Sequence, residues 1–470
     1  MNPKTRIEHD LIGEREVPNE RYYGVQTLRA LENFDITGIP ISHYPRLVHS
    51  LAYIKKAAAL ANAELGLLDA AIAQVIAQAC DDVLAGKLNA DFVVDAIQGG
   101  AGTSTNMNAN EVIANRALEI MGYPKGHYEV VHPLNHVNMS QSTNDVYPTA
   151  LRLTLSQKMD GMMVEMRRLR DALRIKGHEF KDVLKMGRTQ LQDAVPMTLG
   201  QEFEAWAVMV EEDIQRVVEV QVLIREINMG ATAIGTGLNA HPEYAPLVTE
   251  KLRQVSGVPV QLSHNLVEAT QDAGDYVQLS GVLKRVAAKI SKISNDLRLL
   301  SSGPRAGLGE INLPRMAPGS SIMPGKVNPI IPEVVNQVAF AVIGNDLTVT
   351  MAVEAGQLEL NAFEPVIGYS LFNSLDMLGR ACRTLADRCV KDITANREHC
   401  RRMVENSIGL VTALVPIIGY EKSTEVADLA LQTGGSVYEI VLEKGYMSKA
   451  DLEDMLTPER MTQPRAVHRG

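Results

Sequence analysis

The sequence predicts a mostly all-α protein of three domains, with a central bundle of long helices that forms a multi-subunit helical core. Three observations predict this fold class: a length of 470 residues, an aromatic content of only 4%, and apolar residues that recur at spacings of three and four. A prior of about 150 residues per domain gives three domains. Scarce aromatics and 20 methionines suit closely packed helices better than a β-sheet core.

Three apolar stripes predict the central helices, because each is spaced like one face of an α-helix. The stripes are Leu155, Met159, Met162, Met166, Leu169 and Leu173; Phe203, Trp206, Val210, Ile214, Val217, Val220, Ile224 and Ile227; and Leu279, Leu283, Val286, Ile290, Ile293, Leu297 and Leu300. Each stripe is longer than the mean helix of about 11 to 12 residues. We therefore expect long rods packed side by side, whose remaining apolar surface is covered in an oligomer. A large monomeric bundle would show the same spacing.

The domain boundaries follow from changes in pattern along the chain. Residues 1–140 mix short helical patterns with Gly and Pro breaks, and predict a mainly helical domain in which residues 128–131 are one of few strands. Residues 141–395 contain the long stripes. Residues 396–470 have short helical patterns and turn signals, which predict a small C-terminal helical domain.

Composition excludes several classes of partner. The net charge of -10 argues against nucleic acid, whose phosphates are bound by clustered Lys and Arg. The N-terminus resembles no signal peptide, and no run approaches the roughly 18 apolar residues typical of a membrane span. We therefore expect a cytoplasmic protein that binds neither nucleic acid nor membrane.

Four segments rich in Gly, Ser, Thr and Asn lie between the helical patterns, at residues 99–110, 138–145, 187–193 and 319–329. Such residues cap helices, and the same backbone N–H groups and hydroxyls can surround an anion. The last segment places two adjacent serines before Lys326 and Asn328, a combination suited to holding a carboxylate beside a nucleophilic oxygen. The residues alone do not distinguish helix capping from anion binding.

The sequence lacks the motifs of several common cofactor and metal sites. The glycine-rich segments lack the P-loop lysine and the GxGxxG spacing, and the chain has neither a His-Glu-x-x-His sequence nor a C-x-x-C pair. Nucleotide, NAD and catalytic transition-metal sites are therefore not expected. Hydroxyls, amides and one or two positive side chains remain to perform the chemistry.

Residues 319–328 read GSSIMPGKVN, which is similar to the Gly-Ser-Ser-x-Met-Pro-x-Lys-x-Asn signature of the aspartase/fumarase superfamily. The resemblance covers essentially the whole chain, from the sequence YYGVQT at residues 22–27 onward. Val327 stands where argininosuccinate and adenylosuccinate lyases usually carry a basic residue. Ser142-Thr143-Asn144-Asp145, Gly187-Arg188-Thr189-Gln190 and residues 354–361 look like the aspartase branch rather than the fumarase branch.

The resemblance implies a carbon-nitrogen lyase of the ammonia-lyase type. Its reaction would be the reversible conversion of L-aspartate to fumarate and ammonia, by abstraction of the Cβ proton through an aci-carboxylate intermediate. A fumarate hydratase acting on L-malate, or a noncatalytic structural protein on the same scaffold, are the alternatives. The resemblance also implies a homotetramer with active sites shared between subunits and no required cofactor, and leaves open an activating divalent metal such as magnesium.

Roles for individual residues are likewise implied by the resemblance. Ser320 would take the Cβ proton, and the other site residues would bind substrate: Ser142, Thr143 and Ser321 at the β-carboxylate; Thr189, Gln190, Lys326 and Asn328 at the α-carboxylate; Thr103 and Asn144 at the amino group. Gln190 departs from the many relatives that have His there. Because a glutamine amide does not titrate at neutral pH, this position cannot serve as an acid or a base.

Overall fold

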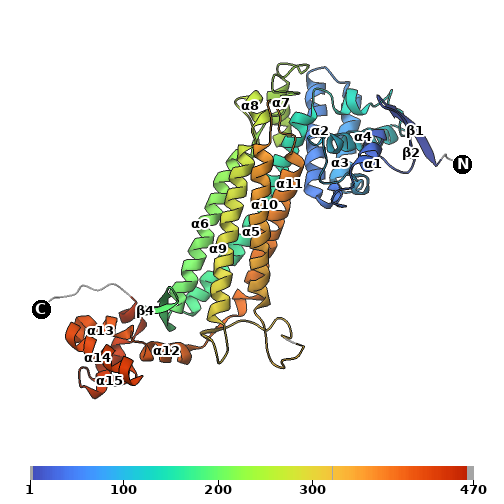
Figure 1. Ribbon diagram of the computed structural model, residues 1–470. Helices are drawn as coiled ribbons and strands as arrows, with labels where there is room; N and C mark the ends of the chain where they lie inside the picture. The colour runs from blue at the N-terminus through green and yellow to red at the C-terminus, as the bar shows by residue number, and fades with distance from the viewer. Residues whose placement is uncertain (1–3, 320, 463–470) are drawn as a thin grey trace. The chain divides into compact units, whose positions relative to one another are not determined.

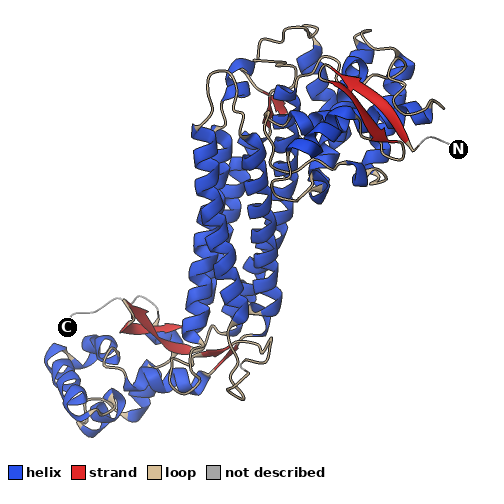
Figure 2. Cartoon of the chain, turned by 45° about the vertical axis from the view of Figure 1, so that its right-hand side comes forward, coloured by secondary structure: helices blue, strands red, loops and turns tan. Residues whose placement is uncertain are grey.

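The computed structural model describes residues 4–319 and 321–462 of the chain. Helices dominate, and among these residues the strands form four two-stranded sheets (Figure 2). The prediction of a mostly all-α fold is confirmed.

Packing divides the chain into two compact units, each assembled from three segments. Unit 1 contains Met1–Met163, Gln215–Arg285 and Ala341–Met377, and unit 2 contains Val164–Ile214, Val286–Phe340 and Leu378–Gly470. The division into domains 1–140, 141–395 and 396–470 stays a prediction.

Five long helices contribute to both units, and within each unit their segments lie side by side (Figure 1). They are α5 (Thr143–Glu179), α6 (Leu199–Ile224), α9 (Gly274–Leu300), α10 (Ile330–Glu354) and α11 (Glu364–Arg388). Every residue of the three predicted apolar stripes is buried, with at most 5% of its surface exposed. The predicted rods are therefore α5, α6 and α9, and their stripes face the core; only Ile227, the last residue of the second stripe, lies beyond the end of its helix, in a short strand.

Ion pairs join neighbouring long helices within each unit. In unit 1 the pairs are Arg152–Asp275 at 2.9 Å, Lys158–Asp376 at 2.7 Å and Lys284–Asp346 at 2.6 Å. In unit 2 they are Arg168–Asp387 at 2.8 Å, Arg170–Glu211 at 2.6 Å and Lys289–Asp213 at 3.1 Å. Several of these side chains are buried, among them Arg152, Lys158 and Asp213, so the pairs fix how neighbouring helices align. Burial of the apolar stripes supplies most of the stability of the bundle, because even a buried ion pair must offset the desolvation of its charges.

The rest of unit 1 is built from short elements. They are β1 (Thr5–Asp10), β2 (Gly13–Pro18), α1 (Val25–Asn33), α2 (Pro45–Glu64), α3 (Ala70–Leu84), α4 (Thr103–Ile120), β5 (Glu226–Ile227), α7 (Tyr244–Ser256), β6 (Gln261–Leu262) and α8 (Leu266–Gln271). Strands β1 and β2 pair antiparallel, and β5 and β6 pair parallel. The expected strand at residues 128–131 is wrong: these residues form turns.

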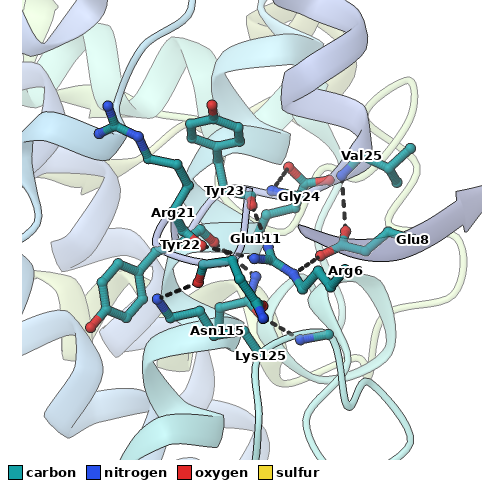
Figure 3. A network of polar contacts seen from close by, with 12 residues as sticks. Arg6, Glu8, Arg21, Tyr22, Tyr23, Gly24, Val25, Glu111, Asn115 and Lys125 are labelled. Atoms are coloured by element: carbon teal, nitrogen blue, oxygen red, sulfur yellow. Dashed lines mark hydrogen bonds and ion pairs between the residues drawn. The ribbon is translucent and has the colours of Figure 1, made fainter. Parts of the chain in front are cut away.

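A buried carboxylate holds the β1–β2 hairpin against the start of α1 (Figure 3). Glu8, 4% exposed, accepts hydrogen bonds from the backbone N–H of Val25 at 2.9 Å, from Arg6 Nε at 2.7 Å and from the hydroxyl of Tyr128 at 3.0 Å. The Tyr128 side chain thus crosses to the hairpin while its own backbone turns. A charge-assisted contact, and not strand pairing, therefore joins Tyr128 to the hairpin.

Glu111 of α4 holds the same segment from the other side (Figure 3). Its carboxylate accepts from the backbone N–H groups of Gly24, Gln26 and Thr27 and from the Thr27 hydroxyl, at 2.6 to 3.1 Å. Burial raises the pKa of Glu111 to about 7, although these four donors favour the charged form. The start of α1 is thereby fixed to α4.

Unit 2 contains the remaining short elements. They are β3 (Leu184–Thr189), β4 (Gln192–Thr198), β7 (Ile311–Asn312), β8 (Thr394–Ala395), α12 (Arg397–Asn406), α13 (Leu410–Ile418), α14 (Tyr420–Thr433), α15 (Val437–Glu443), α16 (Lys449–Met455) and α17 (Pro458–Met461). The C-terminal helices share one apolar core that includes Leu184 and Met186 of β3. That core anchors the β3–β4 hairpin.

Helix α10 has an uncovered apolar face. Phe340 is 64% exposed, and Leu347 and Met351 are each 63% exposed. By length and composition α10 is the one helix among residues 4–319 and 321–462 that could cross a membrane, with 33% of its apolar window buried. The same composition is found in core helices of multi-subunit bundles.

Candidate active site

Two of the four polar segments begin helices in unit 1. Segment 99–110 leads into α4, whose first residue is Thr103 and whose N-cap is Gly102. The exposed Thr103 hydroxyl donates to the Gly100 carbonyl at 2.7 Å. Because the hydroxyl hydrogen is used in this bond, the oxygen can still accept a hydrogen bond from another group.

The second segment, 138–145, leads into α5. The carboxylate of Asp145 accepts from Ser142 N at 3.0 Å, and the Ser142 hydroxyl accepts from Asn144 N at 3.2 Å. These bonds cap the helix, so the capping interpretation holds for Ser142 and Asp145. The side chains of Ser142, Thr143 and Asn144 are half-buried and remain within reach of a ligand.

Asp145 also binds a second loop. Its other oxygen accepts from the backbone N–H groups of Gly230 at 3.1 Å and Thr232 at 3.0 Å. The Asn144 amide donates to the carbonyl of Ala233 at 2.7 Å. The loop at residues 230–233 thus fixes the position of Ser142, Thr143 and Asn144.

The two segments of unit 1 meet through buried amides. The side-chain amide of Asn106 in α4 donates to the Thr143 hydroxyl oxygen and to Oδ1 of Asn138, both at 3.1 Å. Lys55 of α2, which is completely buried, donates to Asn106 at 2.6 Å and to Asn138 at 2.9 Å. A buried cation therefore lies directly beneath the candidate carboxylate-binding loop.

Burial shifts both charged groups of this cluster. It lowers the pKa of Lys55 to about 7, and the neighbouring Asp145 charge opposes that shift. Burial likewise raises the pKa of Asp145 to about 7, against the effect of its three backbone donors and of Lys55. The opposite charges favour each other's ionised form, as required of buried groups that act together.

The third segment, 187–193, is the turn of the β3–β4 hairpin in unit 2. Thr189 pairs with Gln192, and the two residues between them, Gln190 and Leu191, have φ angles of 55° and 62°. A two-residue turn with both φ angles positive matches the twist of a hairpin but is costly for residues other than Gly and Asn. The Gln190 side chain is thus presented by a strained backbone.

A buried acid anchors the base of this hairpin. Glu310, whose side chain is 1% exposed, forms ion pairs with Arg188 and, at 3.1 Å, with Lys185. Lys185 is itself paired with Glu202. Because removing one member would leave uncompensated buried charge, this network rigidifies the strand that carries Thr189.

The fourth segment, 319–329, also lies in unit 2, in the loop before α10. Ser321 and Lys326 are exposed, and the Asn328 amide donates to the carbonyl of Gly319 at 3.3 Å. Lys326 and Asn328 line a groove of about 550 Å³ together with Arg298 and Arg315. Three cationic side chains around one groove suit an anionic ligand. Ser320, the proposed base, lies outside the described residues.

The candidate residues thus form two groups. Unit 1 holds Thr103, Ser142, Thr143 and Asn144, and unit 2 holds Thr189, Gln190, Ser321, Lys326 and Asn328. Within the described chain, no three His, Cys, Asp or Glu side chains are grouped so as to hold a metal ion.

Known proteins similar to this chain match it over nearly its full length. Aspartate ammonia-lyase of Helicobacter pylori is 59% identical over 98% of both chains, and that of Escherichia coli K12 is 53% identical over 99% of this chain and 97% of its own. The lyase family model matches residues 13–344, and the fumarase C C-terminus model matches residues 410–463. The chain belongs to the aspartase/fumarase family of lyases.

Solved structures of this family have the same fold. A fumarate lyase:delta crystallin of Brucella melitensis bound to cobalt has a TM-score of 0.96 and 56% identity, and covers 98% of this chain and 100% of its own. Class II fumarase of Schistosoma mansoni has a TM-score of 0.92 at 35% identity, with the same coverage. The family predicted from the GSSIMPGKVN sequence is confirmed.

The sequence analysis did not identify the buried residues that hold the four polar segments in place. Asn106 and Asp145 lie within the polar segments, and Glu310 precedes the last of them, but nothing in their spacing marks them as buried. Lys55 did carry a signal. It follows Leu51 and Ile54 on the core-facing side of α2, a position where a lysine needs specific partners.

Proposed function

We propose that this chain catalyses the reversible deamination of L-aspartate to fumarate and ammonia. The observation that carries the proposal is the 53 to 59% identity, over nearly the whole chain, to aspartate ammonia-lyases of several bacteria. Gln190 supports it further, since it offers hydrogen bonds to an α-carboxylate without titrating.

The difficult step is removal of a proton from Cβ. The electron pair of the C–H bond moves onto the β-carboxylate, which becomes a dianionic aci-carboxylate; its collapse forms the C=C bond and expels the amine. Such a reaction is accelerated by groups that bind the dianion more strongly than the substrate carboxylate. Ser142, Thr143 and Ser321 supply hydroxyl donors for it, and Ser320 is the proposed base.

The remaining groups would orient the substrate. Lys326 and Asn328, with Thr189 and Gln190, hold the α-carboxylate. Thr103 and Asn144 face the amino group. Lys326 supplies the charge-assisted contact of this set.

The decisive experiment compares two substrates on one preparation. We expect fumarate, followed by its ultraviolet absorbance, and ammonia, followed by a coupled assay, to appear together from L-aspartate and not from L-malate. Fumarate from L-malate alone would identify a fumarate hydratase. Absence of turnover on both would favour a noncatalytic structural protein.

Two substitutions test the assignment of roles. Ser320→Ala should lower kcat by at least about 10²-fold with little change in folding, because it removes the base. Lys326→Ala should raise KM for L-aspartate roughly 10- to 100-fold, the value of a hydrogen bond to a charged group. Lys292→Ala, which removes a surface lysine of α9, is the matched control. An unchanged KM in Lys326→Ala would exclude it from the α-carboxylate site.

We further propose a homotetramer in which different subunits supply the two groups of site residues. The uncovered apolar face of α10, with Phe340, Leu347 and Met351, supports an assembly around a shared helical core. Refolding a mixture of Ser142→Ala and Lys326→Ala chains should restore activity above the mean of the two, because some sites then receive both intact groups. Activity equal to the mean would place each site within one chain.

Metal activation and location stay predictions. The proposed steps use no metal, so dialysis against a chelator should leave turnover of L-aspartate, and added magnesium should alter only its rate. Loss of all activity on chelation, restored by magnesium, would contradict this. A cytoplasmic location is expected for an enzyme of amino-acid metabolism.

A further inference from the structure

Lys55 fixes the orientation of the amides beneath the candidate site. Its ammonium contacts three side-chain oxygens, those of Asn106 at 2.6 Å, Asn138 at 2.9 Å and Gln141 at 3.0 Å. An ammonium only donates hydrogen bonds, so each partner must present its oxygen and not its nitrogen. Three acceptors match its three N–H bonds.

The orientation of Asn106 then determines the role of Thr143. With its oxygen bound to Lys55, the Asn106 amide must direct its NH₂ group the other way, where it reaches Asn138 Oδ1 and Thr143 Oγ1, both at 3.1 Å. Both amide hydrogens are therefore used. The Thr143 oxygen is occupied as an acceptor from inside the protein, and its own O–H is left to donate outward.

We propose that Asn106 is a positioning residue that makes the Thr143 hydroxyl a dedicated hydrogen-bond donor to the substrate carboxylate. The chain from Lys55 through Asn106 to Thr143 runs in one direction, so the buried positive charge strengthens each successive donor. This inference rests on the proposed function, which places the β-carboxylate of L-aspartate at Thr143. It adds a residue that does not touch the substrate.

Asn106→Asp tests the direction of the bond with almost no change in shape. The aspartate still offers an oxygen to Lys55, but it offers a second oxygen to Thr143, whose hydroxyl must then turn inward to donate. We expect kcat/KM for L-aspartate to fall, and the dissociation constant of fumarate to rise, by roughly 10- to 100-fold, the effect of losing a donor to a charged group.

A double-mutant cycle separates positioning from a general structural role. In a Thr143→Val background there is no hydroxyl to orient, so Asn106→Asp should change fumarate binding less than about twofold. Additive losses would overturn the inference, since they would show that Asn106 acts without Thr143. Fumarate affinity unchanged in Thr143→Val alone would overturn it as well.

Asn110→Asp controls for the added charge. Asn110 lies one turn further along α4, is completely buried and donates to the same Asn138 oxygen at 3.2 Å, whereas the hydrogen bond to Thr143 comes from Asn106. An equal loss in Asn110→Asp would assign the effect to charge and contradict the inference. If Asn106→Asp fails to fold, Asn106→Ala takes its place in the double-mutant cycle. Asn106→Ala leaves the Thr143 hydroxyl free to rotate, so fumarate affinity should fall by less than in Asn106→Asp. In the Thr143→Val background, Asn106→Ala should again leave fumarate affinity unchanged.

Wild-type turnover distinguishes the two proposals. If the wild-type chain does not release ammonia from L-aspartate, the proposed function fails, while the fumarate-binding cycle still reports on Asn106. If turnover is present and the cycle is additive, only the positioning role fails.

Discussion

Gly102→Ala tests the packing on which the start of α4 depends. Gly102 has a φ angle of 88°, and a Cβ atom there would lie no more than 2.6 Å from Cγ, Cδ1 and Cδ2 of Tyr147. Tyr147 is buried, with 2% of its surface exposed. The alanine must therefore displace either the ring or the loop that precedes Thr103.

The expected cost has two parts. A left-handed conformation costs a residue with a Cβ about 1 to 2 kcal/mol, and overpacking a filled site costs about 1 to 3 kcal/mol. The free energy of unfolding should therefore fall by about 2 to 5 kcal/mol. Gly100→Ala is the matched control: its φ is 90°, but its nearest neighbour would be Thr103 Cβ at 3.8 Å, so only the conformational part applies.

Urea unfolding of both variants at one protein concentration measures their free energies of unfolding. That of Gly102→Ala should be lower than that of Gly100→Ala by about 1 to 3 kcal/mol. Adding Tyr147→Leu removes the ring atoms that the new Cβ meets, so Gly102→Ala should cost less in that background than in the wild type. Equal losses in Gly102→Ala and Gly100→Ala would refute the steric argument.

Two further predictions concern backbone strain and pH. Leu191→Asn should stabilise the β3–β4 hairpin by about 1 kcal/mol, because Leu191 has a φ of 62° and an apolar side chain that is 69% exposed; a lower urea midpoint would contradict this. Burial raises the pKa of Glu364 from 4.5 to about 8, against the effect of Arg152, so the folded protein keeps a proton that the unfolded chain releases. The free energy of unfolding of the wild type, relative to Glu364→Gln, should fall by up to about 1.4 kcal/mol per pH unit between pH 4.5 and 8, and parallel urea midpoints across that range would exclude the effect.

The long helices could be predicted because their apolar residues face one common core. Trp206, Ile290 and the other members of the three stripes are buried over lengths that no strand reaches. The bounds of α9 follow in the same way, since Leu300 is its last residue and a polar Ser-Ser-Gly-Pro sequence comes next.

The N-terminal hairpin could not be predicted, because its inward-facing residue is not apolar. In β1 only Glu8 is buried, so the alternation that marks a half-buried strand is absent from the sequence. The strand predicted at residues 128–131 was wrong for the opposite reason. An aromatic residue near two valines is typical of a strand, but the Tyr128 hydroxyl donates to Glu8 and accepts from Asn115. In both places a buried carboxylate, and not the apolar pattern, determines the backbone.

The polar segments raised a choice between helix capping and ligand binding, and in unit 1 the direction of the internal hydrogen bonds shows which donor and acceptor positions would remain for a ligand. The Thr103 hydroxyl donates to Gly100 and the Asn144 NH₂ donates to Ala233, which leaves each side chain an acceptor oxygen, whereas Thr143 accepts from Asn106 and keeps a donor. An ammonium group only donates and a carboxylate only accepts, so this set of one donor and two acceptors is complementary to the two ends of a β-amino carboxylate. L-malate would present a hydroxyl to the same two acceptors and could satisfy only one of them. If the proposed function holds, internal hydrogen bonds that appear structural would thereby supply the selectivity for L-aspartate over L-malate.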